Sequence, residues 1–447
     1  MHPAERTGEI NESFELFKVK NKPVVVSQTR LDLSSNAGFL AVSKVERQMG
    51  LIDSLLGCFE GARHKRGRQV KDHSRIQHDL FDLLKQRVFQ MALGYEDGID
   101  ANVLRHDPCL QLSVGKNEAL ASQPMMSRLE NWVTKKDLYR AWKQLVQIYA
   151  DHFHEPGQPI VLEIDSTEDP VHGQLGLFNG YFRNHCFHPI LVTDEATSFP
   201  FGIILRDGHW GSAKNAKAIL KRIIAWLKEA IPGVSIVIKA DSSFGIADLI
   251  NWFEEIGVDY ILGLSGNQVL YRAVEALEEG VLAEYEQDKN PLQRFESLSY
   301  RAKTWKNAHP VVAKVEHTGK GINRRFVVSS MFCDDPQKLY GCYQRRAKGI
   351  EAIIEQLKNG LRFDKTACHE KLPNQMRYLE SALAWILHLK LMEKTKGIFT
   401  WIPTAQTLIQ KVLKVAAIIK ESTRRFLIEL PLNDPHAFHL FHVLNTT

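Results

Sequence analysis

The sequence predicts an α/β fold whose centre is a mixed β-sheet. Two short runs rich in Val and Ile, residues 160–164 and 234–239, lead directly into Asp165 and, through Ala240, into Asp241. Such runs, followed at once by Asp, Ser and Gly, are typical of buried strands that end in a turn. The other elements expected in this core are strands near 185–192, 199–205 and 258–264 and helices at 213–229 and 246–257.

The order of these elements along the chain favours one topology. Three consecutive strands form a meander, and each later strand follows a helix, which is the pattern of parallel strands. A three-stranded meander joined to helix-linked parallel strands is a mixed sheet of the ribonuclease H-like kind. Open α/β sheets bind their ligands at the carboxyl ends of such strands, so Asp165 and Asp241 are candidates for a functional site.

Further regions are expected on both sides of this core. The clearest linker, Glu155-Pro156-Gly157, follows a stretch from Asn36 to about Ala150 with helical periodicity. The chain is again mostly helical and apolar from Gln375 to about Ile419. The predicted regions are a helical N-terminal region (1–155), the ribonuclease H-like core (156–270 and 338–400), an antiparallel β-rich insertion (271–337) with a helix near 271–284 and strands at 297–305, 311–317 and 324–331, and a helical, basic C-terminal tail (401–447).

Composition excludes several classes of protein. The chain has 447 residues, a net charge of +5 and a pI near 8.7, a mild basic excess that permits a polyanionic partner without requiring one. Its six cysteines include no C-x-x-C pair, which argues against a zinc ribbon or a disulfide framework and fits a reducing compartment. No apolar run is long enough to span a bilayer, so we expect a cytoplasmic protein without a membrane partner.

A third carboxylate would complete a metal site. The helix predicted over residues 340–360 buries an isoleucine-rich stripe and carries Glu351 on an adjacent face. If this helix packs across the two strands, Glu351 meets Asp165 and Asp241. Like charges at close range raise one another's pKa, a cost that Mg²⁺ or Mn²⁺ removes. Two such ions about 4 Å apart can cleave a phosphodiester. The alternative is that the aspartates only cap turns and Glu351 lies on a solvated helix face.

Clustered cations in the N-terminal region suggest contact with DNA. The stretch from Ala62 to Arg75 contains six Lys or Arg residues against one Asp. Such a cluster gains affinity for duplex DNA by releasing counterions, although a solvated loop between helices has the same composition. A helix predicted to begin near Ser122 places Arg128 where a helix-turn-helix protein contacts DNA. Residues 1–155 are therefore predicted to bind DNA, and the candidate contacts are Arg63, Lys65, Arg66, Arg68 and Arg128.

The sequence resembles insertion-sequence transposases of the DDE type, and among them the IS-thirteen-eighty family of the group with a Tyr–Arg–Glu–Lys signature. The matching stretches, spread from about Leu31 to Arg425, are ALGYEDGIDANVLRHDP, LASQPMMSRLEN, LEIDSTEDPVHGQ, IKADSSFG, GVDYILGLSGN, YQRRAKGIEAIIEQLKNG and NQMRYL. The residues that match the signature by type are Tyr343, Arg346, Glu351 and Lys358. The step from Arg346 to Glu351 is one residue longer than the group's usual pattern, and Ser243 stands where glycine usually follows the second aspartate.

This resemblance implies cut-and-paste DNA transposition. Asp165, Asp241 and Glu351 would bind two Mg²⁺ ions, with Mn²⁺ able to substitute, and the substrate would be double-stranded DNA. Cleavage would occur at the terminal inverted repeats of the transposon, followed by strand transfer into target DNA. The resemblance also implies a homodimer on paired ends, in the cytoplasm of a prokaryote and associated with the nucleoid.

Further DNA contacts are implied by the same resemblance. Tyr343, Arg346 and Lys358 would contact phosphates near the scissile bond, which fits their hydrogen-bonding chemistry, although Lys358 could instead form a surface ion pair with Glu355. Trp305 is a candidate, by position only, for an aromatic side chain that holds a flipped base, with a buried core tryptophan as the alternative. Two other functions stay open: DNA binding without catalysis, and a metal-dependent DNA nuclease without strand transfer.

Overall fold

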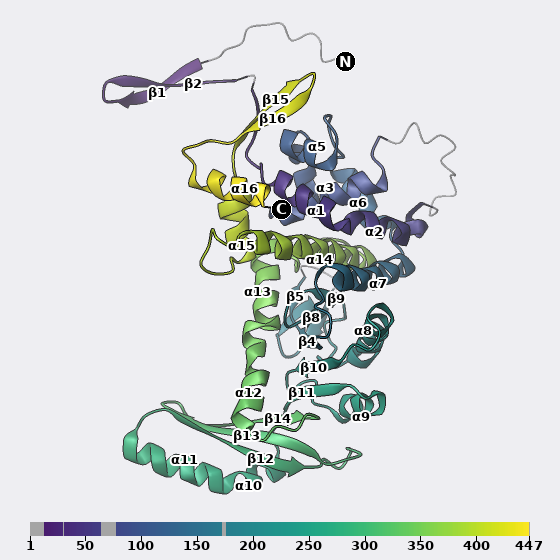
Figure 1. Cartoon of the computed structure of the whole chain (residues 1–447), viewed down its shortest axis with the longest axis vertical. Coiled ribbons are helices and arrows are strands. Elements are labelled where there is room, and N and C mark those ends of the chain that lie inside the picture. Colours follow the sequence, from purple (N-terminus) through teal and green to yellow (C-terminus); the bar gives the residue numbers. More distant parts are fainter. Residues whose placement is uncertain (1–12, 30, 64–76, 172–175, 447) are drawn as a thin grey trace.

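An eight-stranded mixed sheet forms the centre of the protein (Figure 1). The computed structural model describes residues 13–29, 31–63, 77–171 and 176–446, and all structural statements concern these residues. In spatial order the strands are β12 (Leu292–Tyr300), β13 (His309–Thr318), β14 (Gly321–Ser329), β11 (Asp259–Leu264), β10 (Ile236–Ala240), β4 (Ile160–Ser166), β8 (Ile190–Asp194) and β9 (Pro200–Ile204). β10 is parallel to its neighbours β4 and β11, and the other pairs are antiparallel. The predicted mixed α/β architecture is confirmed.

The topology of the central five strands is consistent with a ribonuclease H-like fold. β4, β8 and β9 form the meander, and the helices α8 (Ala216–Ala230) and α9 (Ala247–Ile256) precede the parallel strands β10 and β11. α8 and α9 cover one face of the sheet, while α12 (Pro336–Gln344) and α13 (Ile350–Leu361) run along the other (Figure 1). In the register of β4 with β10, Ile164 pairs with Ala240, so Asp165 and Asp241 follow at the same level of the sheet.

The prediction of a single strand around 185–192 is wrong. The structure divides this stretch into β7 (Asn184–Phe187), which pairs with β5 (Asp169–Pro170) and β6 (Leu177–Asn179) in a small separate sheet, and β8, which begins at Ile190. Pro189 lies between the two strands, and proline has no amide hydrogen to donate to a strand partner.

The antiparallel strands β12–β14 belong to the same sheet as the core. β14 pairs with β11, so these strands extend the central sheet. The helix expected near 271–284 is divided at Val274 into α10 (Gln268–Ala273) and α11 (Glu275–Asp288). The strand expected at 297–305 ends at Tyr300 instead, and Trp305 lies in the turn that follows.

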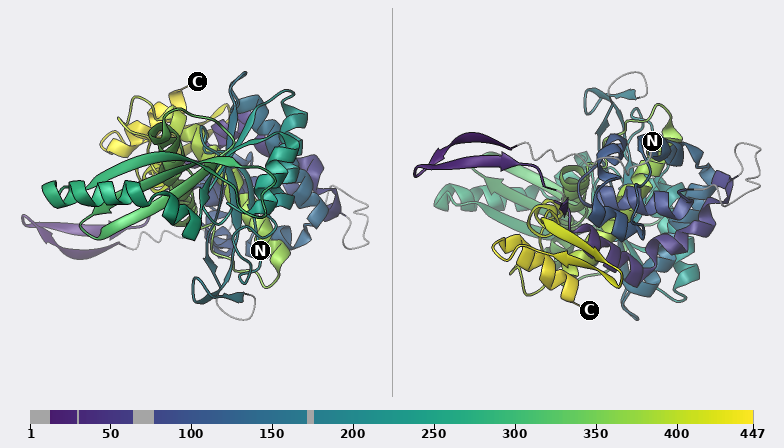
Figure 2. Two further views of the ribbon diagram at one scale, coloured as in Figure 1. Left: turned by 90° about the horizontal axis from the view of Figure 1, so that it is seen from below. Right: turned by 90° about the horizontal axis from the view of Figure 1, so that it is seen from above.

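The N-terminal helices pack around one long buried helix, α14 (Lys371–Lys394), as Figures 1 and 2 show. α14 contacts α3, α6, α7 and β9, and thereby joins the helical layer to the edge of the sheet. No helix among the described residues is both long and apolar enough to cross a membrane. The main helices of the layer are α1 (Phe39–Met49), α2 (Leu51–Leu55), α3 (Leu80–Ala92), α4 (Ala101–Leu104), α5 (Pro108–Val114), α6 (Gln123–Trp132) and α7 (Lys135–His152).

Of the strands near the two ends of the chain, only the short strand at RFLIEL (residues 425–430) is expected from the sequence, and it is confirmed as β16. β1 (Ser13–Val19) and β2 (Lys22–Ser27) form a hairpin that extends away from the body (Figures 1 and 2). The mostly helical stretch expected to reach about Ile419 ends earlier, at Leu413, because Ala417 begins β15. The elements of this C-terminal segment are α15 (Ala405–Leu408), a π-helical turn (Ile409–Leu413), β15 (Ala417–Ser422), β16 (Arg425–Glu429) and α16 (Pro435–Asn445). β15 pairs with β16 and with β3 (Asp32–Ser34), and pairing between segments so distant in sequence overrides local helical periodicity.

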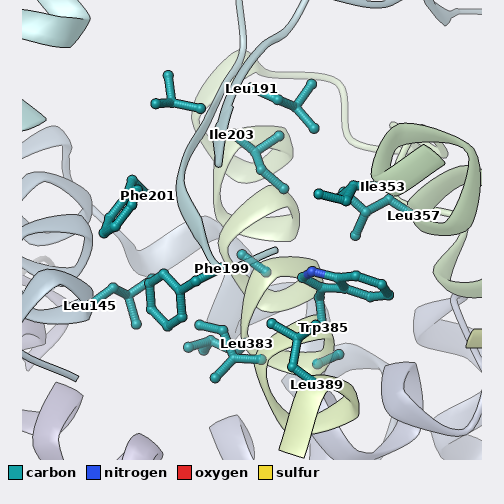
Figure 3. Close-up of a cluster of buried hydrophobic side chains, with 14 of the residues drawn as sticks. Leu145, Leu191, Phe199, Phe201, Ile203, Ile353, Leu357, Leu383, Trp385 and Leu389 are labelled. Carbon is teal, nitrogen blue, oxygen red and sulfur yellow. The ribbon is translucent and has the colours of Figure 1, made fainter. Parts of the chain in front are cut away.

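A continuous apolar core holds α13 and α14 against the sheet (Figure 3). Phe199, just before β9, and Phe201, within it, pack edge-on against Tyr149 of α7. Trp385 of α14 is buried, and its indole N–H donates to the Ser198 carbonyl oxygen at 3.0 Å. Ile353 and Leu357 of α13 project into the same cluster. The position of α13 relative to β4 is therefore fixed by packing, which matters because α13 carries Glu351.

Candidate active site

The site lies at the carboxyl ends of β4 and β10, where Asp165 and Asp241 are located. Asp165 is mostly buried and accepts a 2.7 Å hydrogen bond from the backbone N–H of Ser166. The pKa of Asp165 is raised to about 6, chiefly by burial and also by the neighbouring carboxylates of Asp241 and Glu351, while Arg346 acts in the opposite direction. Both other carboxylates are thus close enough to act electrostatically on Asp165. The structure brings the three predicted acidic residues together.

Asp241 occupies a turn that is built around its own side chain. Oδ1 accepts a hydrogen bond of 2.9 Å from the N–H of Ser243, and the Ser243 hydroxyl lies 3.4 Å from Oδ2. Serine at this position, where the resemblance predicts glycine, is compatible with the turn, because the shorter hydrogen bond uses its backbone N–H. Gly263 of β11 lies below it, and a Cβ there would be 2.6 Å from the N atom of Ser242 and from the Tyr343 hydroxyl. This close approach places the Tyr343 side chain beside the Asp241 turn.

Glu351 stands at the first turn of α13, with a side chain that is 54% exposed. Its Oε1 lies 3.8 Å from Nη1 of Arg346. Carboxylates are favourable near a helix N-terminus, where backbone N–H groups concentrate positive charge. Glu351 is thus the solvent-facing member of the three, and Asp165 is the buried one.

Arg346 lies between the carboxylates. It belongs to the short 3-10 helix Arg345–Lys348 that joins α12 to α13, and only 4% of it is exposed. Its Nη2 donates a 2.9 Å hydrogen bond to Oδ2 of Asp165, and its guanidinium centre is 5.9 Å from the Tyr343 ring. Burial raises the pKa of the Tyr343 hydroxyl, which keeps this side chain a hydrogen-bond donor. The predicted signature residues Tyr343, Arg346 and Glu351 therefore share one site.

The donor set fits a divalent cation, although Arg346 now compensates part of its negative charge. Three carboxylates offer hard oxygen ligands of the kind Mg²⁺ and Mn²⁺ prefer. In this conformation the described part of the chain contains no group of three His, Cys, Asp or Glu side chains spaced to hold one ion. The pKa of Asp165 is raised chiefly by burial and in part by the two other carboxylates, and a bound cation would offset both effects by stabilising the ionised form. Asp165, Asp241 and Glu351 are the residues that could hold it.

Comparison with known families agrees with this geometry. The family model described as transposase DDE domain group 1 matches residues 16–446. The chain belongs to this family. A comparison with curated proteins finds no match. As a member of a DDE transposase family, the protein is expected to act on DNA.

Lys358 lies on α13 seven residues, or about two helical turns, after Glu351. Its Nζ donates a 2.6 Å hydrogen bond to the carbonyl oxygen of Glu168 and lies 3.9 Å from Asp364. The hydrogen bond to Glu168 ties α13 to the segment that follows Asp165, whereas Asp364 lies in the turn just after α13. Lys358 therefore holds this segment against α13. Its contact with a DNA phosphate stays a prediction.

The other predicted DNA contacts lie elsewhere. Arg128 is exposed on α6 in the helical layer. Arg63 ends the 3-10 helix Leu56–Arg63. Lys65, Arg66 and Arg68 lie outside the described residues. Trp305 is corrected as a candidate for holding a flipped base: it is only 4% exposed and packs edge-on against Tyr300 and His309, so the buried alternative describes its position.

Two buried charges behind the site were missed by sequence reasoning. Glu163 precedes Asp165 by two residues on β4, and Lys239 precedes Asp241 by two on β10; both are almost fully buried. The signal was present in the motifs LEID and IKAD, where one charged residue interrupts each otherwise apolar strand. Because side chains alternate along a strand, these residues share the face of the aspartates.

Proposed function

We propose that this transposase-family protein catalyses cut-and-paste transposition of an insertion sequence. It would cleave DNA at terminal inverted repeats and transfer the freed strands into target DNA. The observation that carries the proposal is the meeting of Asp165, Asp241 and Glu351, from two parallel strands and one helix, around a single buried arginine. The Tyr343–Arg346–Glu351–Lys358 pattern supports placement in the IS-thirteen-eighty family. The antiparallel strands β12–β14 beside β11 are consistent with an insertion into a ribonuclease H-like core.

The three carboxylates would hold two Mg²⁺ ions, for which Mn²⁺ can substitute. When bound, such ions activate a water or a 3′-hydroxyl and stabilise the leaving oxygen of a phosphodiester. The chain's own part is to fix the carboxylates on rigid elements and to supply donors for the phosphate. Arg346 and Tyr343 stand closest to the carboxylates and would contact the DNA backbone near the scissile bond. Lys358 would contact the same backbone from the next turns of α13.

The N-terminal helical region would supply affinity for the transposon end. Arg128 and the basic stretch from Arg63 to Arg68 are the proposed phosphate contacts. Contacts of this kind add affinity that does not depend on the DNA sequence. Joining two ends into one target requires two active sites, so we expect a homodimer on paired ends. The place of action would be the prokaryotic cytoplasm, at the nucleoid.

A cleavage assay tests this proposal directly. The substrate is a duplex that carries the inverted repeats flanking the coding region, and strand products are resolved on a denaturing gel with Mg²⁺, Mn²⁺ or EDTA. We expect metal-dependent nicking at the repeat boundary that Asp241→Ala abolishes, while binding of the duplex in Ca²⁺ is retained.

The two other functions are outcomes of the same experiment. Binding without cleavage in either metal would indicate a DNA-binding protein that has no catalysis. Cleavage without joining, when precut ends and a supercoiled target are supplied, would indicate a nuclease without strand transfer. Either result would overturn the proposal.

A further inference from the structure

We propose that Glu163 is a positioning residue that sets the location of Glu351 relative to the two aspartates. It does so by capping the N-terminus of α13 from strand β4, which also carries Asp165. Because Glu351 is expected to hold metal ions for DNA cleavage, this inference rests on the proposed function.

The cap is a direct hydrogen bond from a strand to a helix. Oε2 of Glu163 accepts from the backbone N–H of Ile350 at 2.8 Å, and Ile350 is the first residue of α13. None of the residues at the start of this helix provides a side-chain cap of its own, and Gly349 precedes it. A Cβ on Gly349 would overlap with the Glu163 carboxylate, so the glycine leaves the space that Glu163 fills. A single carboxylate thus replaces the usual local cap.

The cap joins all three elements that carry the acidic residues. Glu163 pairs in register with Lys239 on β10, and Nζ of Lys239 lies 3.5 Å from Oε1 of Glu163. Two residues further along these strands are Asp165 and Asp241. One oxygen of Glu163 therefore contacts the helix of Glu351, while the other faces the strand of Asp241. The three carboxylates are held in relation to one another through one side chain behind them.

This network runs from the buried Glu163–Lys239 pair to the protein surface. Lys239 also lies 2.6 Å from Oε1 of Glu195, which in turn lies 3.3 Å from Nε of Arg345 at the start of the 3-10 helix before α13. Glu163 and Lys239 are almost fully buried. Buried ion pairs add little net stability over apolar packing, whereas they can enforce one arrangement of the elements that carry them. The arrangement enforced here is the position of α13.

The test measures both the helix N-terminus and metal binding in the full-length protein. Hydrogen exchange of the Ile350 amide reports the cap, and the electron paramagnetic resonance signal of Mn²⁺ reports metal affinity without DNA. For Glu163→Ala we expect about tenfold faster exchange at Ile350. We also expect Mn²⁺ affinity to fall by about tenfold or more, as is typical when a group that orients a metal ligand is removed. Cleavage of the transposon-end duplex should fall by a similar factor or more.

Two further variants separate positioning from stability. Glu163→Gln keeps an oxygen acceptor for the Ile350 amide, so exchange and Mn²⁺ affinity should return to within about threefold of the wild type. Glu195→Gln is the matched control, since it removes the other carboxylate on Lys239 and leaves the cap in place; exchange at Ile350 should not change. If Glu163→Ala fails to fold, Gly349→Ala disturbs the same cap from the helix side and should give the same losses.

Each outcome distinguishes this inference from the proposed function. Lower thermal stability of Glu163→Ala and Gly349→Ala, with unchanged exchange at Ile350 and unchanged Mn²⁺ affinity, would show a purely structural role and overturn it. If the wild type binds Mn²⁺ but cleaves no DNA, and Glu163→Ala still weakens Mn²⁺ binding, the proposed function fails and the positioning role stands. If Glu163→Ala cleaves at the wild-type rate, the positioning role fails alone.

Discussion

The guanidinium of Arg346 donates a 2.9 Å hydrogen bond to Asp165 and lies 3.8 Å from Glu351, so one buried cation serves two of the three acidic residues. A divalent ion bound by the same carboxylates would compete with it. Arg346 is attached to the short helix between α12 and α13, next to Tyr343. A side chain displaced from the carboxylates by metal would stay at the site, where a DNA phosphate would be its next partner.

Removing this internal cation should strengthen metal binding. For Arg346→Gln at about pH 8 we expect a several-fold gain in Mn²⁺ affinity in the absence of DNA, because the competing charge is gone. Cleavage should nevertheless fall, because a phosphate contact is lost. Arg345→Gln is the matched control, since Arg345 is the exposed neighbour that contacts Glu195 and not Asp165. Weaker Mn²⁺ binding by Arg346→Gln at this pH would contradict competition between arginine and metal.

Metal affinity should depend on pH through Asp165. Its pKa is raised to about 6, chiefly by burial, and only the deprotonated carboxylate binds a cation. Mn²⁺ affinity is therefore expected to be constant at high pH and to fall by up to about tenfold per unit as the pH drops below the pKa. Titration of Mn²⁺ at several pH values measures this. Arg346 lowers the pKa of Asp165, so in Arg346→Gln the fall should begin at higher pH; a wild-type profile that stays flat to about pH 5 would contradict the assignment.

A second buried carboxylate should affect stability rather than metal binding. Asp169 is fully buried, and burial raises its pKa to about 8, although hydrogen bonds from Tyr378 and Thr366 lower it. A folded-state pKa above the unfolded value gives a stabilisation that is complete below about pH 4 and is lost as the pH rises through about 8. The loss is at most about 1.4 kcal/mol per pH unit.

Asp169→Asn removes this titration and keeps a side chain of the same shape. We expect the free energy of unfolding of the wild type to decrease between about pH 4 and pH 8 relative to that of Asp169→Asn. Urea unfolding at a series of pH values measures the difference. Asp151→Asn, which changes an exposed aspartate at the end of α7, is the control and should leave the pH dependence unchanged. Parallel curves for the wild type and Asp169→Asn would show that Asp169 is ionised in the folded protein.

The sequence predicts the strands that carry the aspartates because local pattern and tertiary position agree there. Runs of Val and Ile that end at Asp165 and Asp241 are buried strands in both the prediction and the structure. The prediction fails where distant pairing decides, as for β15, which pairs with β3 across almost the whole chain. The sequence also placed Trp305 at the end of a strand over 297–305, whereas β12 ends at Tyr300. Alternation of apolar and polar residues specifies the end of a strand only weakly.

The parts of the site that could not be predicted are contacts between charges. Neither composition nor periodicity says that Arg346 turns inward to Asp165 while its neighbour Arg345 stays exposed. The 3-10 helix that orients them follows from packing of α12 and α13 on the sheet. Glu163 and Lys239 were visible as charges within apolar runs, and two charged positions of opposite sign on adjacent parallel strands are a usable signal for a buried pair.

The contact between the helical layer and the core depends on Arg87, and its loss should destabilise the fold. Arg87 of α3 is fully buried and forms ion pairs with Glu130 of α6 at 3.2 Å and Glu380 of α14 at 3.4 Å. Arg87→Met leaves both carboxylates without this cation. Breaking a buried pair in this way typically costs about 3–5 kcal/mol. Urea unfolding should therefore show a midpoint well below that of the wild type.

Two comparisons make the loss specific to the buried charges. Arg128→Met, at an exposed position on α6, should change the free energy of unfolding by no more than about 0.5 kcal/mol. Adding Glu380→Gln to Arg87→Met should recover part of the loss, because one uncompensated carboxylate becomes neutral. Burial raises the pKa of Glu380, so this recovery should grow as the pH rises and this carboxylate ionises. Equal stability of Arg87→Met and the wild type would mean that the helical layer is held to α14 by apolar packing alone.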